Sequence, residues 1–270
     1  MKGNVVAYYS EFDERARLSP PWGQIEFVRT QDIIGRYLKR PTAVVLDVGG
    51  ASGRYACWLA HEGIQVHLID PVPLHIEQAQ AASDAQPKAP IASCTIGDAR
   101  QLEFPDAVAD GVLMLGPLYH LLEPRDRHRS LSEAYRVLKP GGHVFAAGIS
   151  RFASTIDGLV AGYHLDPAFR DIMRQDLENG QHRNSTENPA YFTDAFFHHP
   201  DDLRAEVAAV GFEISGLFAV EGIGYMMKDF DENWAIESNR AFLLEIIART
   251  ETEPRLIGAS PHILCVGVKP

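Results

Sequence analysis

Short runs of apolar residues alternate with amphipathic segments through the first 150 residues of the chain. Nearly continuous apolar runs are typical of strands that are buried on both faces of a parallel sheet, and the segments between them have the 3.6-residue period of helices. The runs that predict strands are Val44–Val48, Ile64–Asp70, Ile91–Arg100, Ala109–Gly116 and His143–Ser150, and the predicted helices are Arg54–Glu62, Pro73–Ser83 and Arg127–Leu138. This alternation predicts a doubly wound α/β fold with right-handed crossovers.

The alternation stops after Ser150 and resumes near residue 200. Residues 151–199 contain helical patches and a polar aromatic segment but no clear strand pattern, which predicts a helical cap over the sheet. The later pattern predicts the helices Pro200–Phe212 and Asn233–Thr250 and the strands Glu213–Gly222 and His262–Val268. We therefore expect an N-terminal helical lid in residues 1–40, a ligand-binding α/β domain in residues 41–150 and 200–270, and a substrate cap in residues 151–199.

Composition limits the possible partners. Acidic residues outnumber basic ones by 36 to 25, which disfavours a nucleic-acid surface, since such a surface needs a basic face. No apolar run approaches the length of a membrane span, and the N-terminal segment has no signal-peptide core. Cys57, Cys94 and Cys265 are widely spaced in apolar contexts, so we expect reduced thiols in a cytoplasmic protein without a metal site. We expect a monomer or a homodimer.

A glycine-containing turn follows the first predicted strand, in the segment Asp47–Arg54. The dinucleotide pattern G-x-G-x-x-G fails here, because Ala51 and Arg54 occupy its second and third glycine positions, and the G-K-[S/T] of a P-loop is missing. Asp47 would also repel a pyrophosphate. The turn instead suits a ligand with a cationic or neutral part, and S-adenosylmethionine fits, since it carries a sulfonium, an ammonium and a ribosyl adenine.

Acidic residues also end the next two predicted strands. Asp70 follows Asp47 by 23 residues, which places its carboxylate to accept hydrogen bonds from both ribose hydroxyls. Asp98 could accept from the exocyclic amine of adenine, while the Ala99 amide donates to the ring. A single aspartate at a strand end is more often a helix N-cap, but three at the ends of successive parallel strands favour a ligand site.

Five segments together resemble class I S-adenosylmethionine-dependent methyltransferases: VVLDVGGASGRYACWLA, VHLIDP, GDARQLEF, DGVLMLGPLYHL and EAYRVLKPGGHVFAAGIS. The resemblance covers Thr42 to Ser150 and, in pattern, the last two strands. It implies a Rossmann-like, seven-stranded sheet, mostly parallel with an antiparallel C-terminal strand. Gly49 and Gly53 match the G-x-G-x-G signature of the family, whereas Ala51 replaces its middle glycine. LGPLYHL and the N-terminal YYSEFDERARL are similar to a bacterial branch that acts on small molecules.

The resemblance, together with the strand-end argument, gives a set of expected cofactor contacts. They are Asp47, Gly49, Gly50, Ala51, Gly53, Asp70, Pro71, Asp98, Ala99, Leu115 and Gly116.

In this fold the loop Leu115–His120 faces the transferred methyl group. Relatives that methylate nucleobase or amide nitrogens carry Asn/Asp-Pro-Pro-Tyr at this place, and the present loop lacks the amide-polarising Asn, which argues against such substrates. His120 is the best candidate for a general base, although it could simply pack or cap the following turn. Tyr119 could line the sulfonium through a cation–π contact.

The N-terminal region and the cap supply further candidates. Tyr9 could cover the methyl site and Arg17 could pair with the carboxylate of the cofactor, or this region could simply be an amphipathic helix over the sheet. Aromatic, histidine and acidic side chains are expected to face the acceptor. They are Trp22, Tyr191, His198, His199 and Glu221.

The sequence thus favours a methyltransferase that transfers a methyl group from S-adenosylmethionine to an oxygen or nitrogen atom of a small, partly apolar metabolite and releases S-adenosylhomocysteine. Methylation at carbon and non-methylating binding of the cofactor are the alternatives. A nicotinamide oxidoreductase is disfavoured, because the third glycine and a Tyr-x-x-x-Lys pair are missing.

Overall fold

The computed structural model describes residue 9 and residues 17–38, 43–186 and 188–270. Most of the lid segment expected before residue 17 therefore lies outside the described residues. No helix among the described residues is long and apolar enough to cross a membrane.

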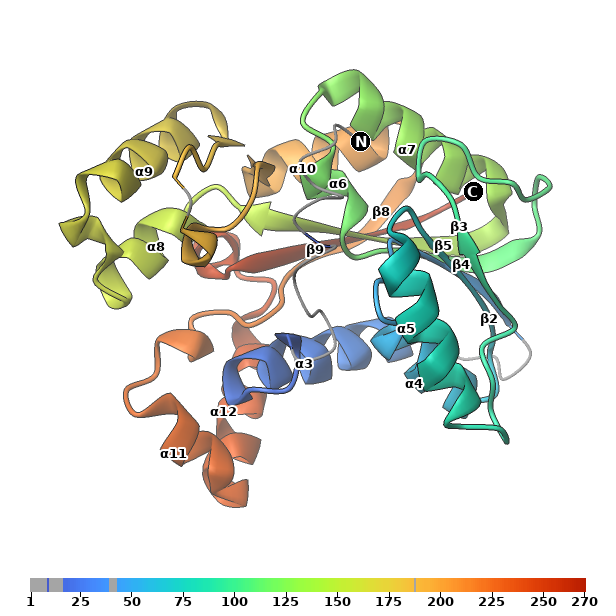
Figure 1. Ribbon diagram of the computed structural model, residues 1–270, viewed down its shortest axis with the longest axis horizontal. Helices are drawn as coiled ribbons and strands as arrows, with labels where there is room; N and C mark the ends of the chain where they lie inside the picture. Colours follow the sequence, from blue (N-terminus) through green and yellow to red (C-terminus); the bar gives the residue numbers. More distant parts are fainter. Residues whose placement is uncertain (1–8, 10–16, 39–42, 187) are drawn as a thin grey trace.

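A twisted sheet forms the centre of the molecule, with the strand order β3-β2-β1-β4-β5-β9-β8 (Figure 1). Its strands are β1 (Val44–Val48), β2 (Gln65–Asp70), β3 (Ser93–Ile96), β4 (Ala109–Met114), β5 (Leu138–Ser150), β8 (Glu213–Ala219) and β9 (His262–Val268). Strands β1 to β5 pair in parallel, and β9 runs antiparallel to both β5 and β8. This confirms the predicted Rossmann-like fold with an antiparallel C-terminal strand.

Helices cover both faces of the sheet (Figure 1). One face packs against α3 (Pro21–Tyr37), α4 (Arg54–His61) and α5 (Pro73–Asp84), and the other against α7 (Pro124–Val137) and α10 (Pro200–Ala209). The two-residue period of β1 divides its side chains between these layers: Val45 belongs to the first core and Leu46 to the second, and both are fully buried. The continuous apolar runs of the sequence therefore reflect burial on both faces.

The cap contains strands that the sequence did not predict. Strand β7 (Ala195–His198) extends the sheet by pairing in parallel with the end of β5, and β6 (Gln181–His182) pairs antiparallel with β7. The expectation of a cap without strands is therefore wrong. The reason is length, because strands of four and two residues are too short to show a period.

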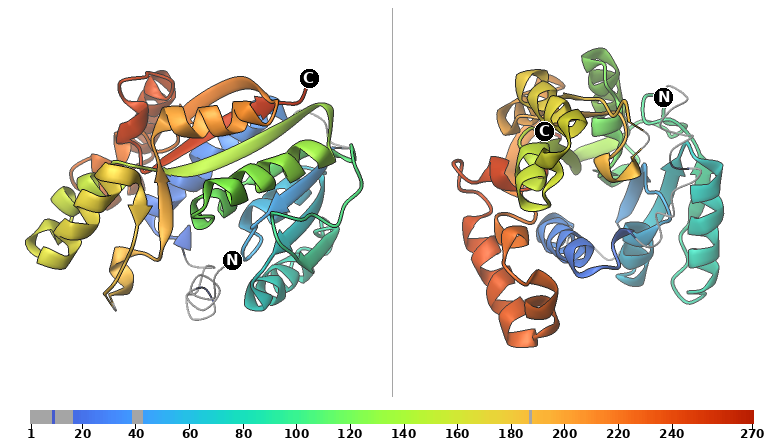
Figure 2. Two further views of the ribbon diagram at one scale, coloured as in Figure 1. Left: turned by 90° about the horizontal axis from the view of Figure 1, so that it is seen from above. Right: turned by 60° about the vertical axis from the view of Figure 1, so that its left-hand side comes forward.

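The rest of the cap is helical, with α8 (Ala153–Val160) and α9 (Pro167–Asn179) beyond the end of β5 (Figures 1 and 2). A buried polar network ties its parts together around Asp176, whose side chain is fully buried. Ser154 donates to the Asp176 carboxylate, and Nδ1 of His182 lies 2.8 Å from the same oxygen. Nε2 of His182 then bonds the Tyr191 carbonyl at 2.8 Å.

The helix predicted for Asn233–Thr250 is divided in the structure. Helix α11 (Phe230–Ala235) ends before Ile236, which has an extended conformation, and α12 (Glu237–Thr250) follows. Helix α11 packs beside α3 through the cluster of Trp234 and Ile25, so this pair of helices supports the N-terminal helix.

Candidate functional site

A cavity of about 410 Å³ opens at the carboxyl ends of β1, β2 and β4 and continues beneath the cap. Most of the predicted site residues line it. They are Tyr9, Arg17, Trp22, Asp47, Gly49, Gly50, Ala51, Asp70, Pro71, Ala99, Leu115, Gly116, Tyr119, His120 and Tyr191. Carboxyl ends of parallel strands are the usual place for ligands in open α/β sheets.

The turn after β1 has three residues in the left-handed region: Gly49 (φ 73°), Ala51 (φ 47°) and Gly53 (φ 83°). A Cβ atom on Gly49 would lie 2.8 Å from Cγ of Pro117, so a larger residue would collide with the start of α6 (Pro117–His120). Gly53 does not line the cavity; it begins α4 and lies against α5 instead. Ala51 adopts a conformation that favours glycine, and its amide donates to Oδ2 of Asp70 at 3.0 Å.

Asp47 is the buried carboxyl group of the site. Its side chain is 1% exposed, and its Oδ2 has no hydrogen-bond partner among the described residues. Burial, with a smaller contribution from the nearby charge of Asp70, raises the pKa of Asp47 to about 7. A cavity-lining carboxylate in this state would gain from a cationic or hydrogen-bond-donating ligand.

Asp70 serves the turn as well as the cavity. Its carboxylate accepts the Val72 amide at 2.9 Å, the Ala51 amide at 3.0 Å and a bond from Nδ1 of His75 at 2.9 Å. These bonds hold the turns after β1 and β2 together, and Asp70 is not the N-cap of α5, a position that Val72 occupies.

Asp98 does not line the cavity. Arg100, two residues later, binds both of its oxygens, with Nη2 to Oδ2 at 2.6 Å, and holds the pKa of Asp98 below its usual range. Ala99 and Gly97 line the cavity in its place. The position of Asp98 therefore does not support the predicted contact of its carboxylate with adenine, because the carboxylate pairs with Arg100 instead.

His120 ends the short helix α6, and its Nε2 lies 3.0 Å from the hydroxyl of Tyr9. Burial lowers the pKa of His120 to about 3, a nearby backbone group at Asp194 opposes this shift, and the charge of Arg17 adds to it. The imidazole is thus neutral at physiological pH, where it can exchange hydrogen bonds but is a weak general base. Tyr119 lies beside it and donates to the Leu115 carbonyl at 3.1 Å.

Aromatic side chains of the cap form the opposite wall of the cavity. Tyr163, Phe169 and Tyr191 pack against one another with ring centroids 4.7 to 5.4 Å apart. Phe192 lies 5.9 Å from the ring of His120. This wall is suited to a flat, apolar molecule.

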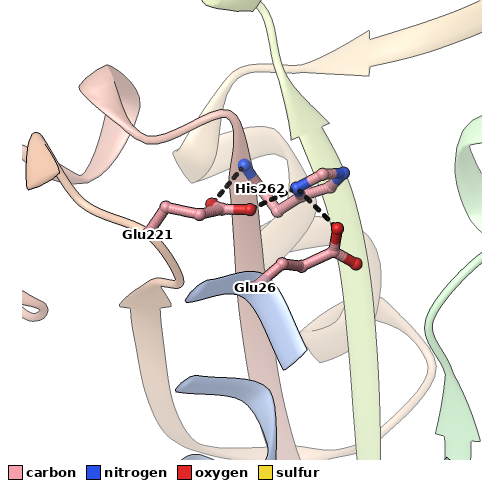
Figure 3. Close-up of side chains that lie close together, drawn as sticks. All are labelled: Glu26, Glu221 and His262. Carbon is pink, nitrogen blue, oxygen red and sulfur yellow. Dashed lines mark hydrogen bonds and ion pairs between the residues drawn. The ribbon is translucent and has the colours of Figure 1, made fainter. Parts of the chain in front are cut away.

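A cluster of charged side chains reaches the cavity through Arg17 and His262, and Figure 3 shows its residues Glu26, Glu221 and His262. Arg17 lines the cavity but is engaged by Glu26, with Nη1 2.6 Å from Oε2. Glu221 was expected to approach the acceptor, but it is 3% exposed and does not line the cavity. It holds His262 instead, with Oε1 2.6 Å from Nδ1, and His262 itself lines the cavity.

His198 and His199 do not reach the cavity. His198 is fully buried 3.3 Å from Glu206, and His199 caps the start of α10. The alternation of β7 explains this: Phe197 faces the cavity, so the next residue faces α10. The structure therefore does not bring either histidine to the strand-end cavity, where the acceptor was expected.

Comparisons with known proteins agree with this geometry. Residues 46–146 match the family described as "Methyltransferase domain". An uncharacterized methyltransferase of Mycobacterium bovis is 30% identical over 142 residues, which is 53% of this chain and 49% of that protein. A ubiquinone/menaquinone biosynthesis C-methyltransferase of Acidiphilium cryptum is 31% identical over 127 residues, or 47% of each protein.

Among solved structures, an S-adenosylmethionine-dependent methyltransferase of Methanosarcina mazei superposes with a TM-score of 0.60 at 20% identity, covering 88% of this chain and 96% of that one. That likeness shows the fold. The chain spans about half the length of the curated relatives it matches. Residues 46–146 are thus similar to a methyltransferase domain, and they supply most of β1, all of β2, β3 and β4, and most of β5.

Proposed function

We propose that this protein transfers a methyl group from S-adenosylmethionine to a small, partly apolar metabolite. The observation that carries the proposal is one continuous cavity that joins buried strand-end carboxylates to an aromatic cap. The methyltransferase domain lies in the part of the chain that supplies the carboxylates. We favour transfer to oxygen or nitrogen, with carbon as the alternative, since one relative is named as a C-methyltransferase.

The residues present fit the cofactor. Asp47 contributes a buried carboxylate oxygen without a partner among the described residues, which suits an ammonium or sulfonium. The chain also lies close around the turn, because a Cβ on Gly50 would be 2.7 Å from Oδ2 of Asp47. We assign Asp70 to the ribose hydroxyls and the backbone beside Ala99 to the adenine. Arg17 and Tyr9 are assigned to the methionine end of the ligand.

S-adenosylmethionine supplies a methyl group already activated by its sulfonium leaving group. The protein therefore has to bind, orient and desolvate. The α6 segment with Tyr119 and His120 forms the floor beside the aromatic wall, where a neutral His120 can orient an acceptor by a hydrogen bond. Tyr9 lies against His120 and closes that side to water. Trp22 and Tyr191 are assigned to the acceptor.

The test is formation of S-adenosylhomocysteine by the purified protein when S-adenosylmethionine is supplied with chromatographic fractions of a bacterial metabolite extract. We expect one or a few fractions to support turnover, and mass spectrometry would identify the product that has gained a methyl group. Gly49→Ala should abolish it, because the new Cβ meets Pro117. Gly141→Ala is the matched control, since Gly141 also has a positive φ (78°) but has open space around its Cβ position.

Two results would contradict the proposal. Failure to bind S-adenosylmethionine would remove its basis. Binding of S-adenosylmethionine without turnover in any fraction would favour the alternative of a non-methylating binder of the cofactor.

A further inference from the structure

Two polar side chains line the cavity and are not used in the proposed transfer. His262 begins β9, and Asp157 lies on α8 of the cap. Both line the cavity together with the aromatic residues, and the charge of His262 acts on Asp157. They come from segments more than a hundred residues apart, so the fold alone brings them to the same cavity.

His262 has a fixed orientation. Its Nδ1 donates to Oε1 of Glu221 at 2.6 Å and lies 3.9 Å from Oε2 of Glu26. Glu221 is itself held, because its Oε2 accepts from the Ser260 hydroxyl at 2.9 Å and from the His262 amide at 3.1 Å. Figure 3 shows Nε2, the second ring nitrogen, pointing away from both carboxylates. The two carboxylates raise the pKa of His262 to about 9 against the effect of burial, so Nε2 carries a proton at neutral pH.

Asp157 offers the complementary group. Burial raises the pKa of Asp157 to about 6, with His262 lowering it and Glu221 raising it. At neutral pH it is therefore an ionised, partly desolvated hydrogen-bond acceptor. Among the described residues, the other charged or titratable groups that interact with this cluster are Arg17, Glu26, Tyr55 and Tyr225.

A donor and an acceptor that line the same largely apolar cavity suit a group that can both accept and donate. A hydroxyl does both, whereas a carboxylate would meet the charge of Asp157 and an ammonium would meet that of His262. We propose that His262 and Asp157 bind a hydroxyl group of the methyl acceptor, and that the acceptor is a hydroxylated aromatic compound. His262 donates to the hydroxyl oxygen, Asp157 accepts the hydroxyl proton, and Glu221 is the positioning residue behind His262. This inference rests on the proposed function only in that the bound compound is taken to be the methyl acceptor.

The same cluster could be considered as a metal site, since ligand atoms of Glu26, Glu221 and His262 lie within 4.8 Å of one another. The contacts argue otherwise. Arg17 binds both oxygens of Glu26, and the ligand atom of His262 is the Nδ1 that donates to Glu221. A cation would have to displace an arginine and break this hydrogen bond.

The experiment compares a phenol with its methyl ether, because the two differ at the hydroxyl alone. Binding of 2-naphthol and of 2-methoxynaphthalene is measured by calorimetry on the full chain saturated with S-adenosylhomocysteine, and the pair 4-phenylphenol and 4-methoxybiphenyl repeats the comparison. We expect each phenol to bind about tenfold tighter than its ether, because the ether oxygen can still accept from His262 but has no proton to donate to Asp157, and one hydrogen bond to a charged group gives a difference of about this size. The preference should be fully developed above a pH of about 6, where Asp157 is ionised, and the phenol should bind most tightly between pH values of about 6 and 9, where His262 is also protonated.

Three variants locate the effect. Asp157→Asn should reduce the preference to about threefold or less, since the acceptor of the phenol proton loses its charge. His262→Gln should weaken the binding of both the phenol and the ether, since both oxygens accept from His262. Glu221→Gln should move the upper pH limit of tight phenol binding downward, which a purely structural role would not do. His61→Gln is the control, since His61 is exposed at the end of α4 and does not line the cavity.

Equal binding of phenol and ether in the wild-type protein, or no binding of either pair, would overturn the inference. A preference that Asp157→Asn leaves unchanged, or phenol and ether affinities that His262→Gln leaves unchanged, would overturn it as well. Binding of S-adenosylhomocysteine by every variant shows that each is folded. The proposed function is judged separately by that binding. The phenol and ether titrations are repeated without S-adenosylhomocysteine, and a protein that prefers phenols in that form but does not bind the cofactor would keep this inference and refute the methyltransferase proposal.

Discussion

Replacing Asp47 by Asn should stabilise the protein and weaken its cofactor site at the same time. A carboxyl whose pKa rises from 3.8 to about 7 on folding costs the folded state about 4 kcal/mol once it is ionised. The sign follows from the raised pKa: the protonated form is tolerated at low pH, and stability is lost as the pH rises from the unfolded value through the folded one. Between pH values of about 5 and 8 this loss is about 2.5 kcal/mol.

The assay is urea unfolding of the wild type and of Asp47→Asn across that pH range, without ligand. The amide cannot ionise, so the variant should gain about 2.5 kcal/mol relative to the wild type between the two ends of the range. That corresponds to about 5 to 10 °C in melting temperature for a domain of this size. Calorimetry at neutral pH should show at least about tenfold weaker binding of S-adenosylmethionine, because a charge–charge attraction is removed.

Asp171→Asn is the matched control, since the side chain of Asp171 is 78% exposed and its pair with Arg174 is at the surface. Its stability difference from the wild type should not vary with pH. If Asp47→Asn showed the same flat difference, the buried carboxyl would be stabilised by contacts other than those described. If the variant bound S-adenosylmethionine as tightly as the wild type, Asp47 would have no part in recognising the cation.

Three further changes test other parts of the site. Ala51→Gly should raise the melting temperature by about 2 to 4 °C, because an alanine in the left-handed conformation costs about 1 kcal/mol. Ala107→Gly, at a similar φ of 53° in an exposed loop, should give the same gain. A lower melting temperature of Ala51→Gly would contradict this explanation. Glu221→Gln should destabilise the protein by up to about 3 kcal/mol near pH 6 and by much less above about pH 9. The reason is that a histidine with a raised pKa stabilises the fold fully below its unfolded pKa, and this stabilisation is lost as the pH rises through the folded pKa. Urea unfolding at both pH values checks the prediction, and an equal loss of stability at both would refute the charged pair with His262. Tyr9→Phe should cost about 0.5 to 1.5 kcal/mol in the same assay through the loss of its hydrogen bond to the α6 histidine, and an unchanged stability would show that this contact is not formed in solution.

Much of the fold could be predicted because the sheet is buried on both faces. The strand from Val44 to Val48 and the closing strand from His262 to Val268 have the bounds expected from their apolar runs. The cap strand β7 could not be found in this way. Its four residues contain two phenylalanines that face opposite sides, Phe197 toward the cavity and Phe196 toward Arg127, so no polar alternation marks it.

Some residues of the candidate site could also be predicted from the sequence, and others could not. Asp47 and Asp70 could be placed because strand ends of a parallel sheet meet at one edge. The pairing of Glu221 with His262 could not, since it joins two loop-proximal residues that only the antiparallel pairing of β8 and β9 brings together. For Asp98 the sequence contained a sign of a local ion pair, because Arg100 follows two residues later and its guanidinium binds the Asp98 carboxylate.

The central claim is that the strand-end cavity binds S-adenosylmethionine through Asp70 and its neighbours. The most direct measurement is a calorimetric titration of the wild type and of Asp70→Ala with S-adenosylmethionine, with NAD as the competing ligand class. The account predicts saturable binding of S-adenosylmethionine to the wild type, no binding of NAD, and a clear loss of affinity in Asp70→Ala. Binding of NAD in preference to S-adenosylmethionine, or equal affinity of Asp70→Ala and the wild type, would contradict it.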